Sequence, residues 1–253
     1  MTTPDQWTIH RYATVSSTQA VAASLIARGT PHRTVVVAER QTGGYGRKGD
    51  AWQDLPDASL LMTLVLRPKH TTSAPQYVMI APLACIAAIR EVSGLNAEIK
   101  WPNDVLLNGR KVAGVLGDAT WRGARLEALR LGIGINVTGD RATFAAHNLP
   151  HASSIAAEAG HAIDRGAMFR AFLASFARLE DQTRAGHVAE IVASWRASVV
   201  TIGHAVVAVR MSGSEIQGVA IDATDDGDLI VTDDAGSNVH LRAAEIRSLR
   251  HAD

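Results

Sequence analysis

Residues 98–116 read EIKWPNDVLLNGRKVAGVL, and this stretch decides the fold that the sequence predicts. Residues 98–101 begin a strand. Two apolar runs, residues 105–107 and 111–116, follow on either side of Asn108-Gly109. An Asn-Gly pair suits the type I′ turn of a two-residue β-hairpin. The stretch therefore predicts short antiparallel strands, with polar residues placed where the first strand ends.

Those polar residues are Asn103 and Asp104, directly after Pro102. A carboxylate at the end of a strand can hold Mg²⁺ or accept a proton, and an amide can bind a phosphate or a sugar. The alternative interpretation is an Asx turn after the proline, with no role in binding.

Lys111 opens the next apolar run, and Gly114 follows three residues later. A lysine in a mostly buried strand is costly unless it meets an anion, and a glycine there lets a ligand approach the backbone. In regular extended backbone, Lys111 and Ala113 share one face and Gly114 takes the other. The alternative is an edge lysine that points to water.

Upstream, residues 43–49 read GGYGRKG and fit neither a helix nor a strand. Glycines let backbone N–H groups approach an anion, and the adjacent Arg47 and Lys48 can neutralise phosphate. Residues 44–49 match the spacing G-x-G-x-x-G, but no helix follows, so a Rossmann site is excluded. A solvated surface turn is the alternative.

The run LEALRLGIGINV, residues 126–137, is a strand that ends in two glycines and an asparagine. Gly132 and Gly134 permit the close approach of a planar ring, and the Asn136 amide can contact a base edge; a β-bulge is the alternative.

Further strands are predicted at 34–38 and 59–66. Helices are predicted at residues 16–29, 76–92 and 164–184, with a helical extension at 188–195.

After about Ser198 the sequence changes to short strands separated by turn residues, at 205–211, 216–222, 229–232 and 239–241. This pattern predicts a small β-barrel. We expect one domain at residues 1–198 and a second at residues 199–253.

Composition narrows the class of protein. The chain has 253 residues, with 25 Lys plus Arg and 25 Asp plus Glu, so its net charge is zero. It has no whole-chain attraction to DNA or to an anionic membrane. Cys85 is the single cysteine, which excludes an internal disulfide and fits the cytoplasm; it is expected to be an inert core thiol. The apolar run 78–89 is shorter than the ~20 residues of a membrane span.

Five segments occur in a characteristic order: SSTQ (16–19), QTGGYGRKGDAW (41–52), KWPND (100–104), KVAGVL (111–116) and LGIGINV (131–137). Together they resemble the biotin protein ligases, also called biotin–[acetyl-CoA-carboxylase] ligases, of the type without an N-terminal DNA-binding domain.

The resemblance implies an α+β fold with a mixed sheet flanked by helices, like class II aminoacyl-tRNA synthetases, followed by an SH3-like β-barrel. It implies that biotin and ATP, with Mg²⁺, form biotinyl-5′-AMP. The lysine of a biotin carboxyl carrier protein of acetyl-CoA carboxylase, or of a related carboxylase, then takes the biotin. No DNA or membrane partner is expected, and the protein is a monomer or a homodimer.

The resemblance also implies site residues. Lys111, Arg47 and Asp104 would act in catalysis, with Asp104 as the metal ligand. The residues implied at biotin are Ser17, Thr18, Gln41, Gly44, Tyr45, Gly46, Lys111 and Gly114. The residues implied at ATP are Arg47, Lys48, Trp52, Lys100, Asn103, Gly134 and Asn136.

This chain departs from the usual GRGRRG loop at Tyr45 and Lys48, and Gln19 stands where asparagine is usual. A lipoate–protein ligase is the first alternative, but KWPND followed by KVAGVL favours biotin. A non-catalytic biotin sensor is a second, and the retained Arg47, Lys111 and Asp104 count against it. A DNA-binding repressor is a third; only 15 residues precede Ser16, so we expect no such domain.

Overall fold

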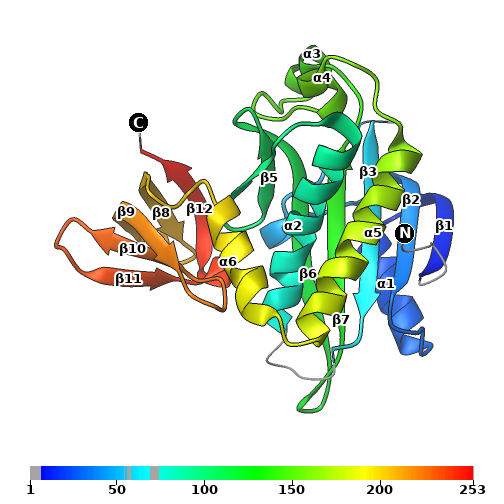
Figure 1. Cartoon of the computed structure of the whole chain (residues 1–253), viewed down its shortest axis with the longest axis horizontal. Helices are drawn as coiled ribbons and strands as arrows, with labels where there is room; N and C mark the ends of the chain where they lie inside the picture. The colour runs from blue at the N-terminus through cyan, green and yellow to red at the C-terminus, as the bar shows by residue number, and fades with distance from the viewer. Residues whose placement is uncertain (1–6, 54, 56–57, 69–73, 253) are drawn as a thin grey trace.

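The computed structural model describes residues 7–53, 55, 58–68 and 74–252. Its larger part is a seven-stranded sheet in the order β1-β2-β3-β7-β6-β5-β4 (Figure 1). β1 and β2 run parallel, and the other neighbouring strands run antiparallel. The strands are β1 (Thr8–Val15), β2 (Thr34–Gln41), β3 (Ser59–Leu66), β4 (Glu98–Lys100), β5 (Asp104–Leu107), β6 (Arg110–Arg122) and β7 (Arg125–Asn136). The predicted α+β class with a mixed sheet flanked by helices is confirmed.

The two faces of this sheet are covered differently, and β7 shows why. Ile133 and Ile135 point to the main core, which α2 helps to form. Gly132 and Gly134, which alternate with them, point to the opposite face. Helix α1 (Thr18–Ala27) covers part of that face, with Ser17 as its N-cap. The part that α1 leaves uncovered carries the candidate site.

Helices α2 (Ala74–Ser93), α5 (Arg165–Arg184) and α6 (Val188–Ser198) pack together on the core side of the sheet (Figure 1). α2 is long and apolar enough to cross a membrane, which the length of the run 78–89 did not indicate. Yet 61% of the apolar segment of this helix is buried inside the protein, as in a core helix. Cys85 lies fully buried in α2, where burial raises the pKa of its thiol, so it is an inert core residue.

A second, five-stranded antiparallel sheet follows α6, with strands in the order β11-β10-β9-β8-β12. Its apolar side chains join the main core, and the Trp101 indole N–H donates to the Gly227 carbonyl at 2.9 Å. The strands are β8 (Ala205–Arg210), β9 (Glu215–Ala223), β10 (Leu229–Asp233), β11 (Asn238–Leu241) and β12 (Ile246–His251). The two sheets therefore pack against one another through the KWPND turn.

Sequence patterning missed four elements: β1, β12, and the short helices α3 (Arg141–Ala146) and α4 (Ile155–Ala159). β1 is an edge strand whose residues are mostly exposed or half-buried, so it lacks an apolar period. β12 alternates polar and apolar residues only weakly. The short helices depend on side-chain caps: Asp140 begins α3 and Ser154 begins α4.

One buried carboxylate stabilises the helical layer. The side chain of Glu180 in α5 has no exposed area, and it accepts a hydrogen bond from Arg33 Nε at 2.7 Å. His32 Nε2 lies 3.0 Å from its other oxygen. Burial alone raises the pKa of Glu180, but hydrogen bonds and charge from His32 and Arg33 hold it below its ordinary value. This cluster ties α5 to the turn before β2.

Candidate active site

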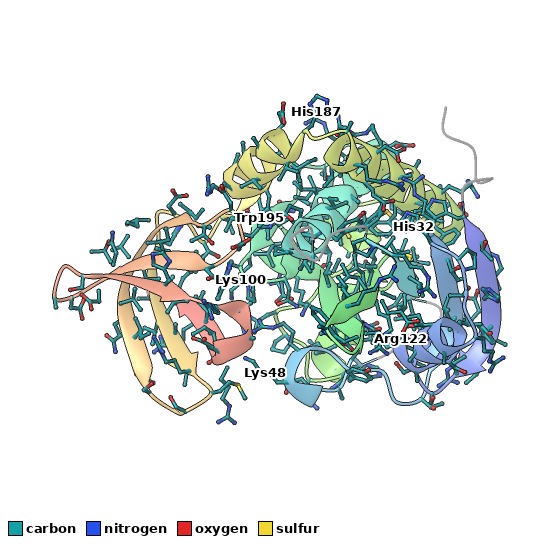
Figure 2. All side chains as sticks on the ribbon, turned by 90° about the horizontal axis from the view of Figure 1, so that it is seen from below. His32, Lys48, Lys100, Arg122, His187 and Trp195 are labelled. Carbon is teal, nitrogen blue, oxygen red and sulfur yellow. The ribbon has the colours of Figure 1, made fainter. Side chains whose placement is uncertain are left out.

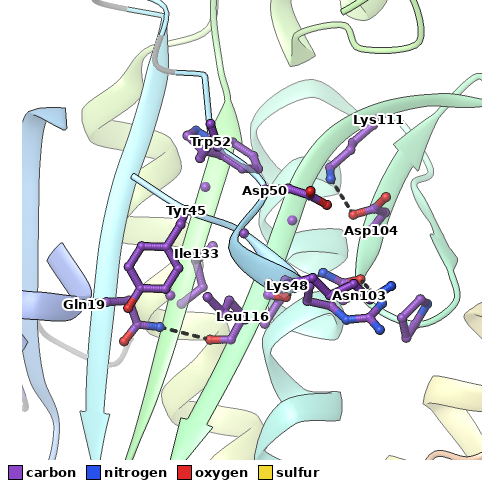
Figure 3. Close-up of a pocket in the computed structure, with 18 of the residues that line it drawn as sticks. Gln19, Tyr45, Lys48, Asp50, Trp52, Asn103, Asp104, Lys111, Leu116 and Ile133 are labelled. Carbon is purple, nitrogen blue, oxygen red and sulfur yellow. Dashed lines mark hydrogen bonds and ion pairs between the residues drawn. The ribbon is translucent and has the colours of Figure 1, made fainter. Parts of the chain in front are cut away.

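A cavity of about 300 Å³ lies on the face of the large sheet beyond the first turn of α1. It is bounded by the glycine loop, the KWPND turn, the strands β6 and β7, and β12 of the second sheet. Residues from Ser17 to Leu249 thus meet in one place, and Figure 3 shows the glycine loop, the KWPND turn, β6 and β7 around it. Lys48 and Lys100 lie on the side that faces the C-terminal strands (Figure 2).

The floor of the cavity is a glycine surface. A Cβ added to Gly134 would lie 2.6 Å from Cε2 of Trp52, and one added to Gly114 would lie 3.1 Å from Cζ3 of the same ring. The indole therefore lies directly on the backbone of β6 and β7. Its Nε1 is buried and has no hydrogen-bond partner. Of the two glycines predicted to admit a planar ring, Gly134 does so, with Trp52 as the ring, whereas a Cβ added to Gly132 would lie 2.7 Å from Gln19 Nε2.

The predicted placement of Lys111 and Gly114 on opposite faces is wrong. β6 pairs Ala113 with Val105 and Lys111 with Leu106, so Val112 is an extra residue in a β-bulge. The bulge reverses the alternation of side chains that follows it. A Cβ on Gly114 would lie only 3.4 Å from Lys111 Nζ, so both residues face the cavity.

Lys111 reaches two partners there. Its Nζ lies 2.6 Å from Asp104 Oδ1, and 5.6 Å from the centroid of the Trp52 ring (Figure 3). The side chains of Lys111 and Asp104 are 35% and 29% exposed, so the pair remains accessible from the cavity. The alternative of an edge lysine pointing to bulk water is thereby excluded.

The opposite end of the cavity is lined by small polar groups at the start of α1. The backbone N–H of Thr18 donates to Gln41 Oε1 at 2.7 Å, and its hydroxyl donates to the same oxygen at 3.0 Å. Gln19 donates from Nε2 to the Leu116 carbonyl at 3.3 Å, while its own Oε1 is buried without a partner. This end offers hydrogen-bond donors and acceptors but no charge.

The glycine loop forms a compact hairpin around a short 3₁₀ turn, η2 (Arg47–Gly49). Tyr45 pairs with Ala51, and the Trp52 N–H donates to the Gly44 carbonyl at 3.0 Å. Asp50, at the end of the turn, lines the cavity as well. The loop thus has its own hydrogen bonds and presents two cations at its tip.

Both cations reach the second sheet. Arg47 donates to the carbonyls of Ala243 and Ile246, the latter at 3.1 Å, and to Asn103 Oδ1 at 3.3 Å. Lys48 donates to the Arg247 carbonyl. Burial lowers the pKa of Arg47, and the nearby carboxylates partly oppose this shift. Burial, followed by the charge of Arg47, lowers the pKa of Lys48. A guanidinium bound only to neutral oxygens is well placed to take an anion.

Most residues that the sequence indicated meet in this cavity. Those that line it are Ser17, Thr18, Gln41, Tyr45, Gly46, Arg47, Lys48, Trp52, Lys100, Asn103, Asp104, Lys111, Gly114 and Gly134. Sequence reasoning did not assign a role to Gln19, Asp50 and the β12 residues Arg247, Ser248 and Leu249. The β12 residues carry no local signal, because only the packing of the two sheets brings them to the cavity.

Two indicated residues do not line the cavity. A Cβ added to Gly44 would lie 2.7 Å from Gln41 Nε2, so the role of this glycine is to leave room for the Gln41 side chain. The Asn136 amide donates to the Ser153 carbonyl at 3.1 Å and accepts from the Ser59 hydroxyl at 3.2 Å. Its side chain is engaged in holding the segment behind Lys111, which corrects the expectation that it faces a base.

The described residues contain no group of three or more His, Cys, Asp or Glu side chains that could hold a metal ion. Asp104 and Asp50 both line the cavity, and the charge of each acts on Arg47. Mg²⁺ usually retains several bound waters and is held by one or two carboxylates together with substrate phosphates. Two carboxylates are therefore enough for Mg²⁺ that arrives with a phosphate substrate. They do not form a cage made by the protein alone.

Comparison with known proteins identifies the family. The model of the biotin/lipoate A/B protein ligase family matches residues 12–136. The biotin–[acetyl-CoA-carboxylase] ligase of Paracoccus denitrificans is 36% identical over 240 residues, which cover 92% of this chain and 98% of that relative. The chain belongs to the biotin/lipoate A/B protein ligase family. The bifunctional ligase/repressor BirA of Bacillus subtilis is 31% identical, over 88% of this chain and 68% of that relative.

Solved structures in this family share the fold. A biotin protein ligase from Aquifex aeolicus, in complex with biotin and ATP, superposes with a TM-score of 0.81 at 23% identity, over 97% of this chain and 99% of that chain. A biotin protein ligase from Leishmania major in complex with biotinyl-5-AMP has a TM-score of 0.64, also at 23% identity, over 93% and 99%. The likeness extends through both sheets.

The contact between Trp52 and the glycine floor gives a first prediction for this family member. In Gly134→Ala the new methyl group overlaps the indole, so Trp52 must move off the glycine floor. We expect the tryptophan fluorescence of the protein to shift to longer wavelength, because the half-buried indole becomes more exposed to water. The same substitution in a Trp52→Phe background is the control, and there the spectrum should not change. An equal shift in both backgrounds would contradict the contact.

Proposed function

We propose that this protein is an ATP-dependent biotin–protein ligase. In the first step, a carboxylate oxygen of biotin attacks the α-phosphorus of ATP. A C–O–P mixed anhydride forms, and the bond to pyrophosphate breaks. In the second step, the amine of a carrier lysine attacks the carbonyl carbon of biotinyl-5′-AMP. An amide forms, AMP leaves with the electron pair of the C–O bond, and the amine loses a proton to Asp104 or to water.

The single observation that carries this proposal is the position of Lys111 beside Asp104 on the glycine floor, in the same cavity that Arg47 lines. A carboxylate and a triphosphate repel one another unless cations hold them together in a site from which water is excluded. Lys111 supplies a charge where the two anions meet, and Arg47 supplies a second on the phosphate side. The name of the Paracoccus denitrificans relative specifies biotin and not lipoate, which favours biotin over the lipoate alternative.

The two ends of the cavity suit the two substrates. The uncharged end with Ser17, Thr18 and Gln41 suits the ureido ring of biotin, which needs both donors and acceptors. Gly46 and Gly114 line the part of the cavity that the chain leading to the carboxylate would cross. Trp52 and Gly134 form a flat surface of the kind that a base or ring can stack on.

Phosphates would meet Arg47, Lys48, Lys100 and Asn103. Mg²⁺, when bound with ATP, would neutralise phosphate charge, with Asp104 and Asp50 as the available carboxylates.

The second sheet, within residues 199–253, is proposed to be an SH3-like barrel, and residues 1–198 the catalytic domain. Its five short antiparallel strands and their tight turns support this interpretation. The proposed partner is the biotin carboxyl carrier domain of a carboxylase, which must present its lysine at the open side of the cavity. A monomer or homodimer in the cytoplasm remains our prediction.

The direct test is biotin-dependent exchange of label between pyrophosphate and ATP, with lipoate as the control substrate. We expect exchange with biotin and none above background with lipoate. A carrier domain added with biotin and Mg-ATP should gain one biotin, visible as a single mass increment. Exchange with lipoate and none with biotin would reject the proposal.

A second prediction concerns retention of the intermediate. Arg47 joins the glycine loop to the second sheet and faces the phosphate side of the cavity. Arg47→Gly should leave adenylation within about tenfold of the wild type but release biotinyl-AMP into solution, because a charge-assisted hydrogen bond is lost. Bystander proteins should then become biotinylated at lysines. Normal adenylation without bystander labelling would contradict the role, and Arg122→Gly, on the exposed end of β6, is the matched control.

A further inference from the structure

A buried carboxylate behind the active site has no role in the reaction as described so far. The side chain of Glu158 in α4 has no exposed area. Its oxygens accept hydrogen bonds from Ser153 Oγ at 2.5 Å, from Asn108 Nδ2 at 2.8 Å, and from Arg141 at 2.8 and 3.0 Å. Burial alone raises the pKa of Glu158, but these hydrogen bonds lower it to about 2, so it stays ionised. One carboxylate thus joins three separate segments.

The first of these segments holds the backbone of Lys111 directly. The Lys111 N–H donates to the His151 carbonyl at 2.9 Å, and the Ser153 N–H donates to the Lys111 carbonyl at 2.9 Å. Residue Ala152 between them forms a parallel bridge with Lys111. Both backbone groups of Lys111 are therefore bound by the segment that Glu158 holds through the Ser153 hydroxyl.

The second segment is the turn that precedes Lys111. Asn108 and Gly109 have φ angles of 49° and 73°, so both residues of the hairpin turn are in the left-handed region. The Asn108 side chain is bound by the same carboxylate. Glu158 therefore restrains the chain on both sides of Lys111: the turn three residues before it and the strand segment alongside it.

We infer that Glu158 is a positioning residue for Lys111: its carboxylate holds the turn at Asn108 and the segment at Ser153, and together these set where the Lys111 amine lies. This inference rests on the proposed function only in its kinetic test, which measures biotin-dependent exchange. Lys111 is half-buried and lies near the start of β6, between the Asn108-Gly109 turn and the bulge at Val112, so regular pairing does not fix its backbone alone. A shift of about 1 Å in a catalytic group can cost 10²-fold in rate.

The kinetic test is Glu158→Gln, which keeps the shape and removes the charge. We expect kcat for biotin-dependent exchange to fall about 10- to 100-fold, with KM for biotin and ATP within about threefold of the wild type. Glu180→Gln is the matched control, since Glu180 is another fully buried carboxylate bound by an arginine, and it has no contact with Lys111. It should lower the melting temperature but leave kcat unchanged. Equal loss of kcat in both variants would overturn the inference.

A coupling test separates positioning from a general loss of structure. In a Lys111→Ala background, Glu158→Gln should cost less than about threefold, because the group that it positions is absent. Additive losses would overturn the inference. Asn108→Gly is the milder variant in case Glu158→Gln fails to fold. Glycine adopts the left-handed conformation of this turn and removes the hydrogen bond from Asn108 to Glu158. We expect kcat to fall by less than in Glu158→Gln. In the Lys111→Ala background, the effect of Asn108→Gly should again be smaller.

A third measurement does not depend on activity. The chain has four lysines, Lys48, Lys69, Lys100 and Lys111, of which Lys69 lies outside the described residues. Reductive dimethylation with ¹³C-formaldehyde keeps the charge of each lysine and gives a few assignable NMR resonances. In Glu158→Gln the Lys111 resonance should move toward that of a free lysine, while Glu180→Gln leaves it unchanged. An unmoved resonance overturns the inference. If the wild type shows no exchange with biotin, the proposed function fails, and this resonance still decides the positioning role.

Discussion

Lys111→Ala lowers the rate of biotin-dependent pyrophosphate exchange by about 10²- to 10³-fold, the usual loss for one preorganised electrostatic contact. The Nζ of Lys111 is the cation nearest to the glycine floor where the two anionic substrates are proposed to meet, and it is already paired with Asp104 at 2.6 Å. The fold should survive, because the side chain is partly exposed and only its backbone holds the strand. The measurement is the exchange rate, with circular dichroism to verify the fold.

Two variants make that result specific. Lys111→Arg should not restore the rate, because the planar guanidinium is bulkier than an ammonium and the space beside Trp52 and Gly114 is narrow. Arg122→Ala is the control on the same strand. Its side chain is 77% exposed, it is the last residue of β6, and its replacement should leave the rate unchanged. Near-normal exchange in Lys111→Ala would exclude the proposed role.

A chain that ends after Ser198 has a pyrophosphate exchange rate more than about 100-fold below that of the whole protein. The deletion removes Arg247, Ser248 and Leu249 from the wall of the cavity, and the carbonyls that bind Arg47. It also exposes Trp101, which is 2% exposed in the whole protein and donates its indole N–H to Gly227. We therefore expect a lower melting temperature together with the loss of activity.

A smaller change separates the two effects of the deletion. Leu249→Ala shortens a cavity-wall side chain while leaving the rest of the second sheet in place. It should reduce exchange with a smaller change in melting temperature than the deletion gives. A truncated chain that stays soluble and fully active would contradict the part assigned to residues 199–253.

Several elements followed from local pattern because their residues are apolar with a regular period. Residues 59–66 form β3 with the predicted bounds, and α5 covers the predicted helix at 164–184 within one residue. The Asn108-Gly109 turn has the positive φ angles that the sequence indicated. The edge strand β1 was missed because one of its sides has no neighbouring strand and few of its residues are buried.

Part of the candidate site was also predicted from local sequence pattern. The glycine loop, the KWPND turn and the KVAGVL strand each combine glycine with polar or charged residues in a way that local chemistry explains. Gln19 and β12 were not predicted as site residues, because a residue that lines a cavity from another element has no local signal. The position of Asn136 was misjudged because its partners, Ser59 and Ser153, are distant in sequence.

The sequence by itself determined the class of fold, the hairpin, the apolar faces, and the set of cations and glycines available for chemistry. These depend on the propensity and spacing of neighbouring residues. Only the tertiary structure decided which of them act together. The bulge at Val112 brings Lys111 and Gly114 to one face, sheet packing brings β12 to Arg47, and a buried carboxylate connects residues 50 positions apart. Contacts of this kind depend on how elements pack in space, which the period of a sequence does not encode.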